Sequence, residues 1–172
     1  MRVLRRDKGF SFVEILISII LVGLSITALL SASTSFTMAN GAGADLSTAE
    51  FLVEQIRELT ALLPVMDPAI TFDQWTSLTA GGDEPTVYDY DDVDDFNGFD
   101  STSLGAPIDA NRNPVTALSA FSQSVVVQKV SQGDFNLVKA ASSTDTAFIR
   151  VTVTVSLNGR EITSASWIRA NY

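Results

Sequence analysis

The hydrophobic pattern begins with a long apolar run over residues 10–30. Glu14 is the only charged residue between Lys8 and Asp45. As a helix that rises about 1.5 Å per residue, the run spans roughly 30 Å, which matches the hydrocarbon thickness of a bilayer. We therefore expect a helix that crosses a membrane and carries one carboxylate near its start.

Residues 31–63 are expected to continue this helix as an amphipathic half, with a weak point at the glycines of residues 40–43. Ser47 and Glu50 fit a capping box, which marks a fresh start after the glycines or is incidental inside one long helix. Pro64 ends the segment. Apolar residues recur here at spacings of three and four, which predicts one buried stripe: Ala49, Leu52, Val53, Ile56, Leu59 and Leu63.

The rest of the chain is expected to form a loop-rich region over 64–120 and an antiparallel sheet over 121–172. All five prolines lie in the first of these. Strands are predicted at 121–130 and 135–139, with a turn between them. From Ala147 to Leu157 apolar and polar residues alternate, which predicts a further strand with one valine-rich face.

Asn158 and Gly159 form the strongest short hairpin signal in the chain. A two-residue loop pairs Leu157 with Arg160. If the register continues in step, Val155 pairs with Ile162, Val153 with Ser164, Val151 with Ser166 and Ile149 with Ile168. The small serines would then make room for the amphipathic helix across the valine face. The fold class is thus α+β, a long N-terminal helix packed on a C-terminal antiparallel sheet.

Residues 1–9 form a short basic leader with Arg2, Arg5, Arg6 and Lys8 against one acid, Asp7. By the positive-inside rule the leader stays in the cytoplasm and the remainder crosses the membrane. An ordinary secretory signal peptide is the simpler alternative. It would need a small-residue cleavage site, such as residues 31–33 or 38–40. A carboxylate inside the apolar region argues against it.

The stretch from Arg5 to Ile17 resembles the prepilin signal of type IV pilins and type II secretion pseudopilins. In that family the basic leader ends in Gly, a Phe or Met becomes the first mature residue, and a Glu stands at mature position five. Gly9, Phe10 and Glu14 match these three positions. The resemblance implies cleavage after Gly9, N-methylation of Phe10 and an assembly role for Glu14.

The resemblance also implies a pilin-like fold and a structural function as a minor pilin-type subunit of a type IV pilus-like filament. The expected partners are a prepilin peptidase, an inner-membrane assembly platform, membrane lipid and other pilin subunits. The chain would start as a single-pass inner-membrane protein and end in an extracellular pilus or a periplasmic pseudopilus. A minor pseudopilin of a type II secretion system and a pilus-tip adhesin that binds through residues 64–120 remain open. Residues 91–99 look like a segment of minor pilins, notably those of mannose-sensitive haemagglutinin pili.

Residues 83–100 form an acidic block with eight acids and no base. Clustered carboxylates are hard oxygen ligands, and related major pseudopilins bind calcium in a loop near the sheet, so calcium is a candidate ligand. The spacing does not fit an EF-hand loop. The alternative is a solvated acidic loop packed by its own aromatic residues. The candidate calcium ligands are Asp91, Asp92, Asp94 and Asp95.

Composition excludes several other classes of function. A net charge of −9 leaves no basic stripe to neutralise phosphates, so no nucleic-acid partner is expected. The chain contains no histidine and no cysteine. It therefore lacks the commonest general base, the commonest zinc ligands and any disulfide. We expect no enzymatic activity and no cofactor beyond calcium.

Overall fold

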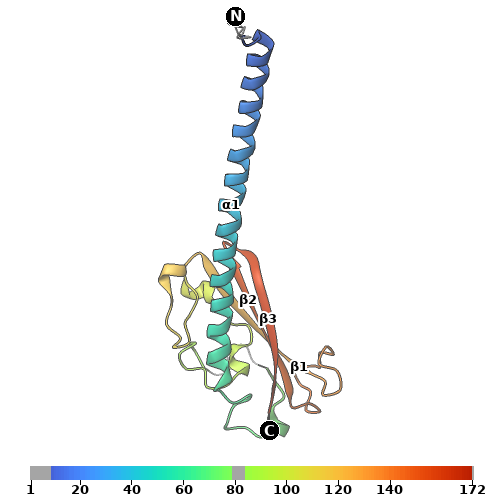
Figure 1. Ribbon diagram of the computed structural model, residues 1–172. Coiled ribbons are helices and arrows are strands. Elements are labelled where there is room, and N and C mark those ends of the chain that lie inside the picture. The colour runs from blue at the N-terminus through green and yellow to red at the C-terminus, as the bar shows by residue number, and fades with distance from the viewer. Residues whose placement is uncertain (1–8, 79–83, 172) are drawn as a thin grey trace, which may run out of the picture. The chain divides into compact units, whose positions relative to one another are not determined.

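The computed structural model describes residues 9–78 and 84–171, so leader residues 1–8 lie outside the described part. One helix, α1 (Phe12–Ala61), precedes three strands, β1 (Phe121–Val130), β2 (Phe148–Leu157) and β3 (Arg160–Ala170) (Figure 1). The fold class predicted from the sequence is confirmed. The chain divides after Gly43 into two compact units, which are described separately below.

The first unit contains the apolar half of α1, and its side chains are open to their surroundings. Each large apolar residue from Phe10 to Leu30 is at least 44% exposed. The hydroxyl groups of Ser18, Ser25 and Thr27 donate to main-chain carbonyls four residues earlier, so they are satisfied within the helix. By length and composition α1 can cross a membrane.

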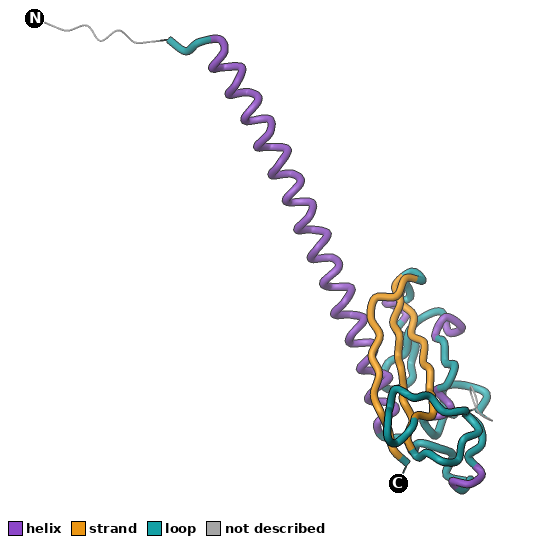
Figure 2. Tube along the Cα trace, turned by 90° about the vertical axis from the view of Figure 1, so that its right-hand side faces the viewer, coloured by secondary structure: helices purple, strands orange, loops and turns teal. Residues whose placement is uncertain are grey.

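The helix α1 is drawn as one unbroken helical tube in Figure 2, and its span includes Gly41 and Gly43. The capping-box residues at 47–50 are therefore incidental, because no helix starts there. The helix ends at Ala61, three residues before Pro64. The predicted apolar stripe is confirmed, with Leu63 partly buried and the others buried: Ala49, Leu52, Val53, Ile56 and Leu59.

The second unit contains a three-stranded antiparallel sheet in the order β1-β2-β3. The hairpin pairing of Leu157 with Arg160 is confirmed, but a β-bulge follows at Val155 and Ser156. The pairs predicted beyond it are wrong by one residue. The inner, valine-rich face meets Thr163, Ala165, Trp167 and Arg169 in place of Ile162, Ser164, Ser166 and Ile168.

The bulge turns Arg169 onto the inner face, where it reaches the C-terminal end of α1. Its guanidinium donates hydrogen bonds to the carbonyls of Thr60 and Leu63. These carbonyls lack helical partners, and a cation near the last turn also suits the helix dipole. A one-residue change of register thus ties the free end of β3 to the end of the helix.

The strand β1 is covered along its outer edge by the loop region. Val125 exchanges backbone hydrogen bonds with Gly98 and Phe99. On its inner face the buried Gln123 side chain donates to the carbonyl of Leu52 in α1 and accepts from the N–H of Ile108. These contacts join helix, sheet and loop around one core.

The loop region contains short 3-10 turns and no strand among its described residues. The turns that matter for the sites below are Phe72–Gln74 and Asp94–Phe96. The strand predicted at 135–139 is wrong: Val138 forms only an isolated bridge with Val130. Phe135 instead packs on Phe148, with ring centroids 5.4 Å apart.

Candidate functional site

The predicted processing residues lie at the start of α1 and are open to a partner. Gly9 and Phe10 precede the helix, and the Phe10 side chain is 79% exposed. A Cβ added at Gly9 would meet nothing within 4 Å, and Gly9 has no positive φ. The fold itself therefore does not require glycine at this position.

Glu14 lies in the first turn of α1, where its N–H donates to the carbonyl of Ser11 at 3.0 Å. Its side chain is exposed. The ion pairs among the described residues are Arg57 with Glu54 and Lys139 with Asp145, so Glu14 has no cationic partner there. An acid in the first turn favours the helix N-terminus by roughly 0.3–1 kcal/mol, a small effect for a charge placed in an apolar segment.

The predicted calcium ligands divide into two overlapping groups. Asp92, Asp94 and Asp95 are buried, and one carboxylate oxygen of each lies within 4.8 Å of the others. Asp91 is exposed and belongs to a second group with Glu84 and Asp95. The alternative of a solvated loop is therefore wrong for three of the four aspartates, which are 2–8% exposed.

The buried aspartates hold the loop backbone by reciprocal hydrogen bonds. The Asp92 carboxylate accepts from the N–H groups of Asp94, at 2.8 Å, and Asp95, at 3.1 Å. The Asp95 carboxylate accepts from the N–H groups of Asp91 and Asp92. Phe96 sits in the core against Tyr90, with ring centroids 5.0 Å apart. The sequence predicted the aromatic packing of this loop but not the burial of its acids.

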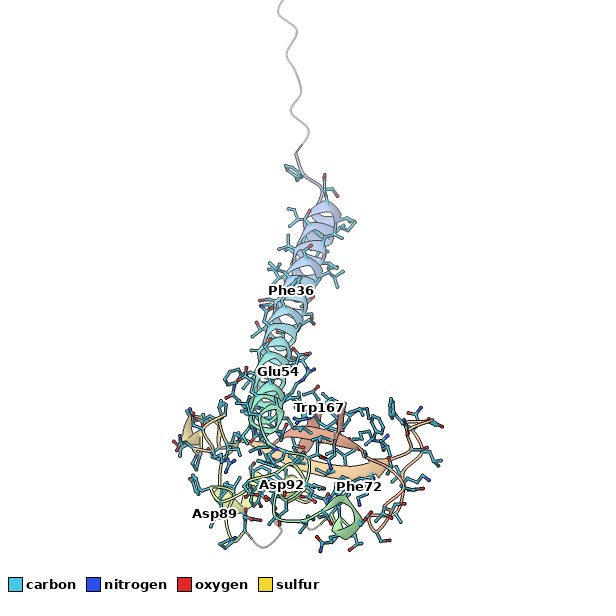
Figure 3. All side chains as sticks on the ribbon, turned by 90° about the horizontal axis from the view of Figure 1, so that it is seen from below. Phe36, Glu54, Phe72, Asp89, Asp92 and Trp167 are labelled. Atoms are coloured by element: carbon cyan, nitrogen blue, oxygen red, sulfur yellow. The ribbon has the colours of Figure 1, made fainter. Side chains whose placement is uncertain are left out.

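Burial and two neighbouring carboxylates raise the pKa of Asp92, labelled in Figure 3, to about 9. The largest cause is burial, which disfavours the charged form. A hydrogen bond with Asp94 and the negative charges of Asp94 and Asp95 act in the same direction. Near neutral pH the cluster therefore keeps a proton at Asp92.

A buried lysine on the neighbouring strand, which was not predicted from the sequence, balances the charge of the cluster. Lys129 is fully buried, with its ammonium 4.0 Å from the centre of the Trp75 ring. It donates to the carbonyls of Trp75 and Ser143, and Trp75 Nε1 donates to Asp94 at 2.7 Å. Burial lowers the pKa of Lys129, while Asp94 acts in the opposite direction. The burial of this lysine could have been predicted from the alternation of β1, which places Lys129 on the inward face of the strand.

The carboxylate oxygens of the cluster lie close enough together to hold a hard cation such as Ca²⁺, which would have to displace the proton on Asp92. We predict that Ca²⁺ raises the melting temperature of the full chain in detergent. Saturation at a hundredfold excess over Kd would stabilise the fold by about 2.7 kcal/mol. The measurement is the melting temperature in millimolar Ca²⁺ and in chelator.

The matched control for calcium is Asp95→Asn, which keeps an oxygen for the N–H groups of Asp91 and Asp92 but removes a charge. We expect this variant to lose the calcium-dependent shift. A wild-type melting temperature that does not change between Ca²⁺ and chelator would contradict the prediction.

Residues 4–30 match the family model of the prokaryotic N-terminal methylation motif, and this stretch contains Gly9, Phe10 and Glu14. Comparison with the curated proteins and with the solved structures found no match. The motif lies at the start of the helix that is long and apolar enough to anchor the chain in a membrane. The chain thus carries the N-terminal motif of type IV pilins and pseudopilins, on a long helix followed by the three-stranded antiparallel sheet of a pilin-like layout.

Proposed function

We propose that this chain is a minor pilin-type structural subunit. It is made as a single-pass inner-membrane precursor with a cytoplasmic leader, cleaved after Gly9 by a prepilin peptidase and methylated at the new amino group of Phe10. An assembly platform then moves its apolar helix from lipid into a filament of other pilin subunits. The observation that carries this proposal is the methylation motif at residues 4–30, joined to an exposed apolar helix.

The freedom at Gly9 supports the peptidase step. Because the fold tolerates a side chain there, glycine at this position suits a partner that binds the backbone closely. A peptidase that draws the scissile bond into a narrow site is such a partner.

The first test is the N-terminus of the mature protein. We predict that mass spectrometry of membrane-extracted protein finds a start at Phe10 with one added methyl group. Gly9→Leu should accumulate as the uncleaved precursor, because a bulky side chain blocks the peptidase. Gly23→Leu is the matched control, since Gly23 also has open space around it but lies inside α1, away from the cleavage step. A mature start near Ala32 or Asn40 would show an ordinary signal peptide.

Two alternatives share parts of this proposal. A minor pseudopilin of a type II secretion system would be processed in the same way and differ only in its machine. Recovery in sheared surface filaments favours the pilus, and confinement to the periplasm together with loss of secretion on deletion favours the pseudopilus.

A tip adhesin is supported by one feature of the loop region. A groove of about 460 Å³ is lined by residues that include Tyr88, Tyr90, Phe99 and Asp100. Aromatic faces next to a carboxylate suit the apolar and hydroxyl faces of a sugar. Binding of the purified full chain to immobilised glycans, lost in Tyr88→Ala, would favour this function.

A further inference from the structure

The two edges of the sheet differ in how they are covered. The edge of β1 is paired with the loop at Gly98 and Phe99. No loop among the described residues pairs with β3 along the centre of its outer edge. There Ser164, Ala165 and Ser166 are all exposed.

The register shows which backbone groups β3 presents at this edge. Both backbone groups of Val125 face away from β2, because they bond to Gly98 and Phe99. In an antiparallel ladder hydrogen-bonded and non-hydrogen-bonded pairs alternate, so Val153, opposite Val125, faces β3. Val153 then exchanges hydrogen bonds with its partner Ala165.

It follows from the alternation that Ser164 and Ser166 point their N–H and C=O groups outward. An exposed row of such groups is a template for another strand. Natural edge strands commonly block this pairing with a lysine, a proline or an inward-pointing charge. Residues 162–168 contain no charged residue and no proline.

A groove of about 350 Å³ runs beside this edge on the inner face, between β3 and α1. Thr163 and Ala165 form its floor, and Glu50, Val53 and Glu54 form its wall. Figure 3 labels Glu54 on α1 and Trp167 on β3, the two elements that border the groove. A fourth strand beside β3 would direct every second side chain toward these carboxylates.

We propose that the free edge of β3 is a docking site for an extended strand of another protein, with basic side chains on its inward face. Main-chain hydrogen bonds to Ser164 and Ser166 would hold the strand. Its lysine or arginine side chains would meet Glu50, and also Glu54, where they would share the carboxylate with Arg57. Such strand addition takes affinity from the backbone and specificity from alternate side chains. The proposal concerns the second unit alone and does not depend on the filament system.

A second copy of this chain is the poorer occupant. Two β3 strands joined edge to edge would form a continuous antiparallel sheet with both α1 helices on one face. The join would then bring two sets of Glu50 and Glu54 to the same side. Repulsion between like charges disfavours that pairing.

The test uses the full chain in detergent and a short capped peptide that alternates lysine and threonine. Hydrogen exchange by NMR reads the contact residue by residue. We expect the peptide to slow exchange of the Ser164 and Ser166 amides by about tenfold or more, since these amides gain partners. The Ala165 amide, already bonded to β2, should change little.

Two comparisons separate strand addition from charge attraction. The first uses a peptide of the same sequence in which alternate backbone amides are N-methylated. This peptide keeps its charge but cannot donate hydrogen bonds from its methylated edge, so it should bind at least about tenfold more weakly than the unmethylated peptide. Ser166→Pro removes one outward N–H without removing a bond to β2, and should weaken binding, whereas Ser166→Ala should not. Glu50→Gln with Glu54→Gln should also weaken it.

Three results would overturn the proposal. The first is no binding of the lysine–threonine peptide. The second is binding without slower exchange at Ser164 and Ser166, or equal binding of the N-methylated peptide. The third is protection of the same amides in the protein alone, rising with its concentration, which would show that a second copy occupies the edge. A failure of filament assembly would affect none of these measurements.

Discussion

Glu14→Leu is expected to insert into the membrane at least as well as the wild type and to be cleaved after Gly9, yet to enter filaments poorly. Removing a carboxylate from an apolar segment relieves a membrane penalty, which reaches roughly 2.5 kcal/mol at mid-bilayer and is smaller near a helix end. Insertion should therefore not suffer. The defect should appear only at filament assembly, when the helix leaves the membrane and packs against the helices of other subunits.

The physical reason is a charge pair that cleavage creates. Removal of the leader leaves a cationic amino group on Phe10, four residues before Glu14 in the same segment. In an apolar environment neither charge is easily left alone, and their attraction grows as the dielectric falls. Glu14 can neutralise the amino group of its own chain or of a neighbour. The apolar side chains around it pack in many registers, and the charge pair would select one.

A stabilising effect on the helix start is the competing explanation, because Glu14 lies in the first turn of α1. Glu14→Gln keeps the size and polarity of the side chain and removes the charge, so it tests the charge itself; helix content separates the two explanations, because only loss of the helix-start effect would lower it. Both variants should show normal membrane and processed fractions and a depleted sheared-filament fraction beside the wild type. Circular dichroism of the purified chains should show equal helix content. Normal recovery of Glu14→Leu in filaments would falsify the pairing mechanism.

The sequence predicted the helix and its buried stripe because both depend on local periodicity. Ala49, Leu52 and Ile56 recur at helical spacing, and nothing elsewhere in the chain overrides that pattern. The start and closing pair of the β2–β3 hairpin were also predictable, since Asn158 and Gly159 adopt the positive φ that a two-residue turn requires.

The register beyond the turn was not predictable in the same way. The bulge at Val155 and Ser156 moves Arg169 to the helix end and Trp167 beneath Arg57, whose guanidinium lies 5.7 Å from the ring centre. Those are long-range contacts, and the alternation of β3 residues fits either register. Tertiary contacts that the local pattern does not contain therefore decide the face of the strand.

The acidic block illustrates a similar limit. Its aromatic residues predicted packing, but whether Asp92 and Asp94 face water depends on Trp75 and Lys129, which lie far away in the sequence. The alternation of β1 places Lys129 inward, and a buried lysine requires acceptors or counter-charges. That signal could have indicated that the acids are buried.

Asp92→Asn is expected to make the fold more stable at alkaline pH and to reduce its dependence on pH. The pKa of Asp92 is about 9 in the folded chain, against the ordinary value of 3.8. Between these values the folded state holds a proton that the unfolded state releases, so the free energy of unfolding falls as pH rises. One proton contributes at most about 1.4 kcal/mol per pH unit, and less where solvent and relaxation screen the charges.

The asparagine replaces the protonated carboxyl group closely. Its oxygen can still accept from the N–H groups of Asp94 and Asp95, and its amide can donate to the Asp94 carboxylate. The variant therefore keeps the loop geometry while it removes the group that must lose a proton. Lys129→Met is expected to lower the free energy of unfolding. It leaves the carbonyls of Trp75 and Ser143 without their donor and the buried acids without their cation.

The measurement is thermal unfolding of the full chain in detergent with chelator present, from pH 5 to pH 9. Fluorescence of Trp75 and Trp167 reports on the second unit, since both lie after Ala44. We expect the melting temperature of the wild type to fall from pH 5 to pH 9 and that of Asp92→Asn to fall less. Above pH 8 the variant should have the higher melting temperature. Asp73→Asn makes the same substitution at an exposed acid and should follow the wild type. Parallel curves for wild type and Asp92→Asn would mean that Asp92 is ionised in the folded chain, and that Lys129 and the backbone N–H groups suffice to hold three buried carboxylates together.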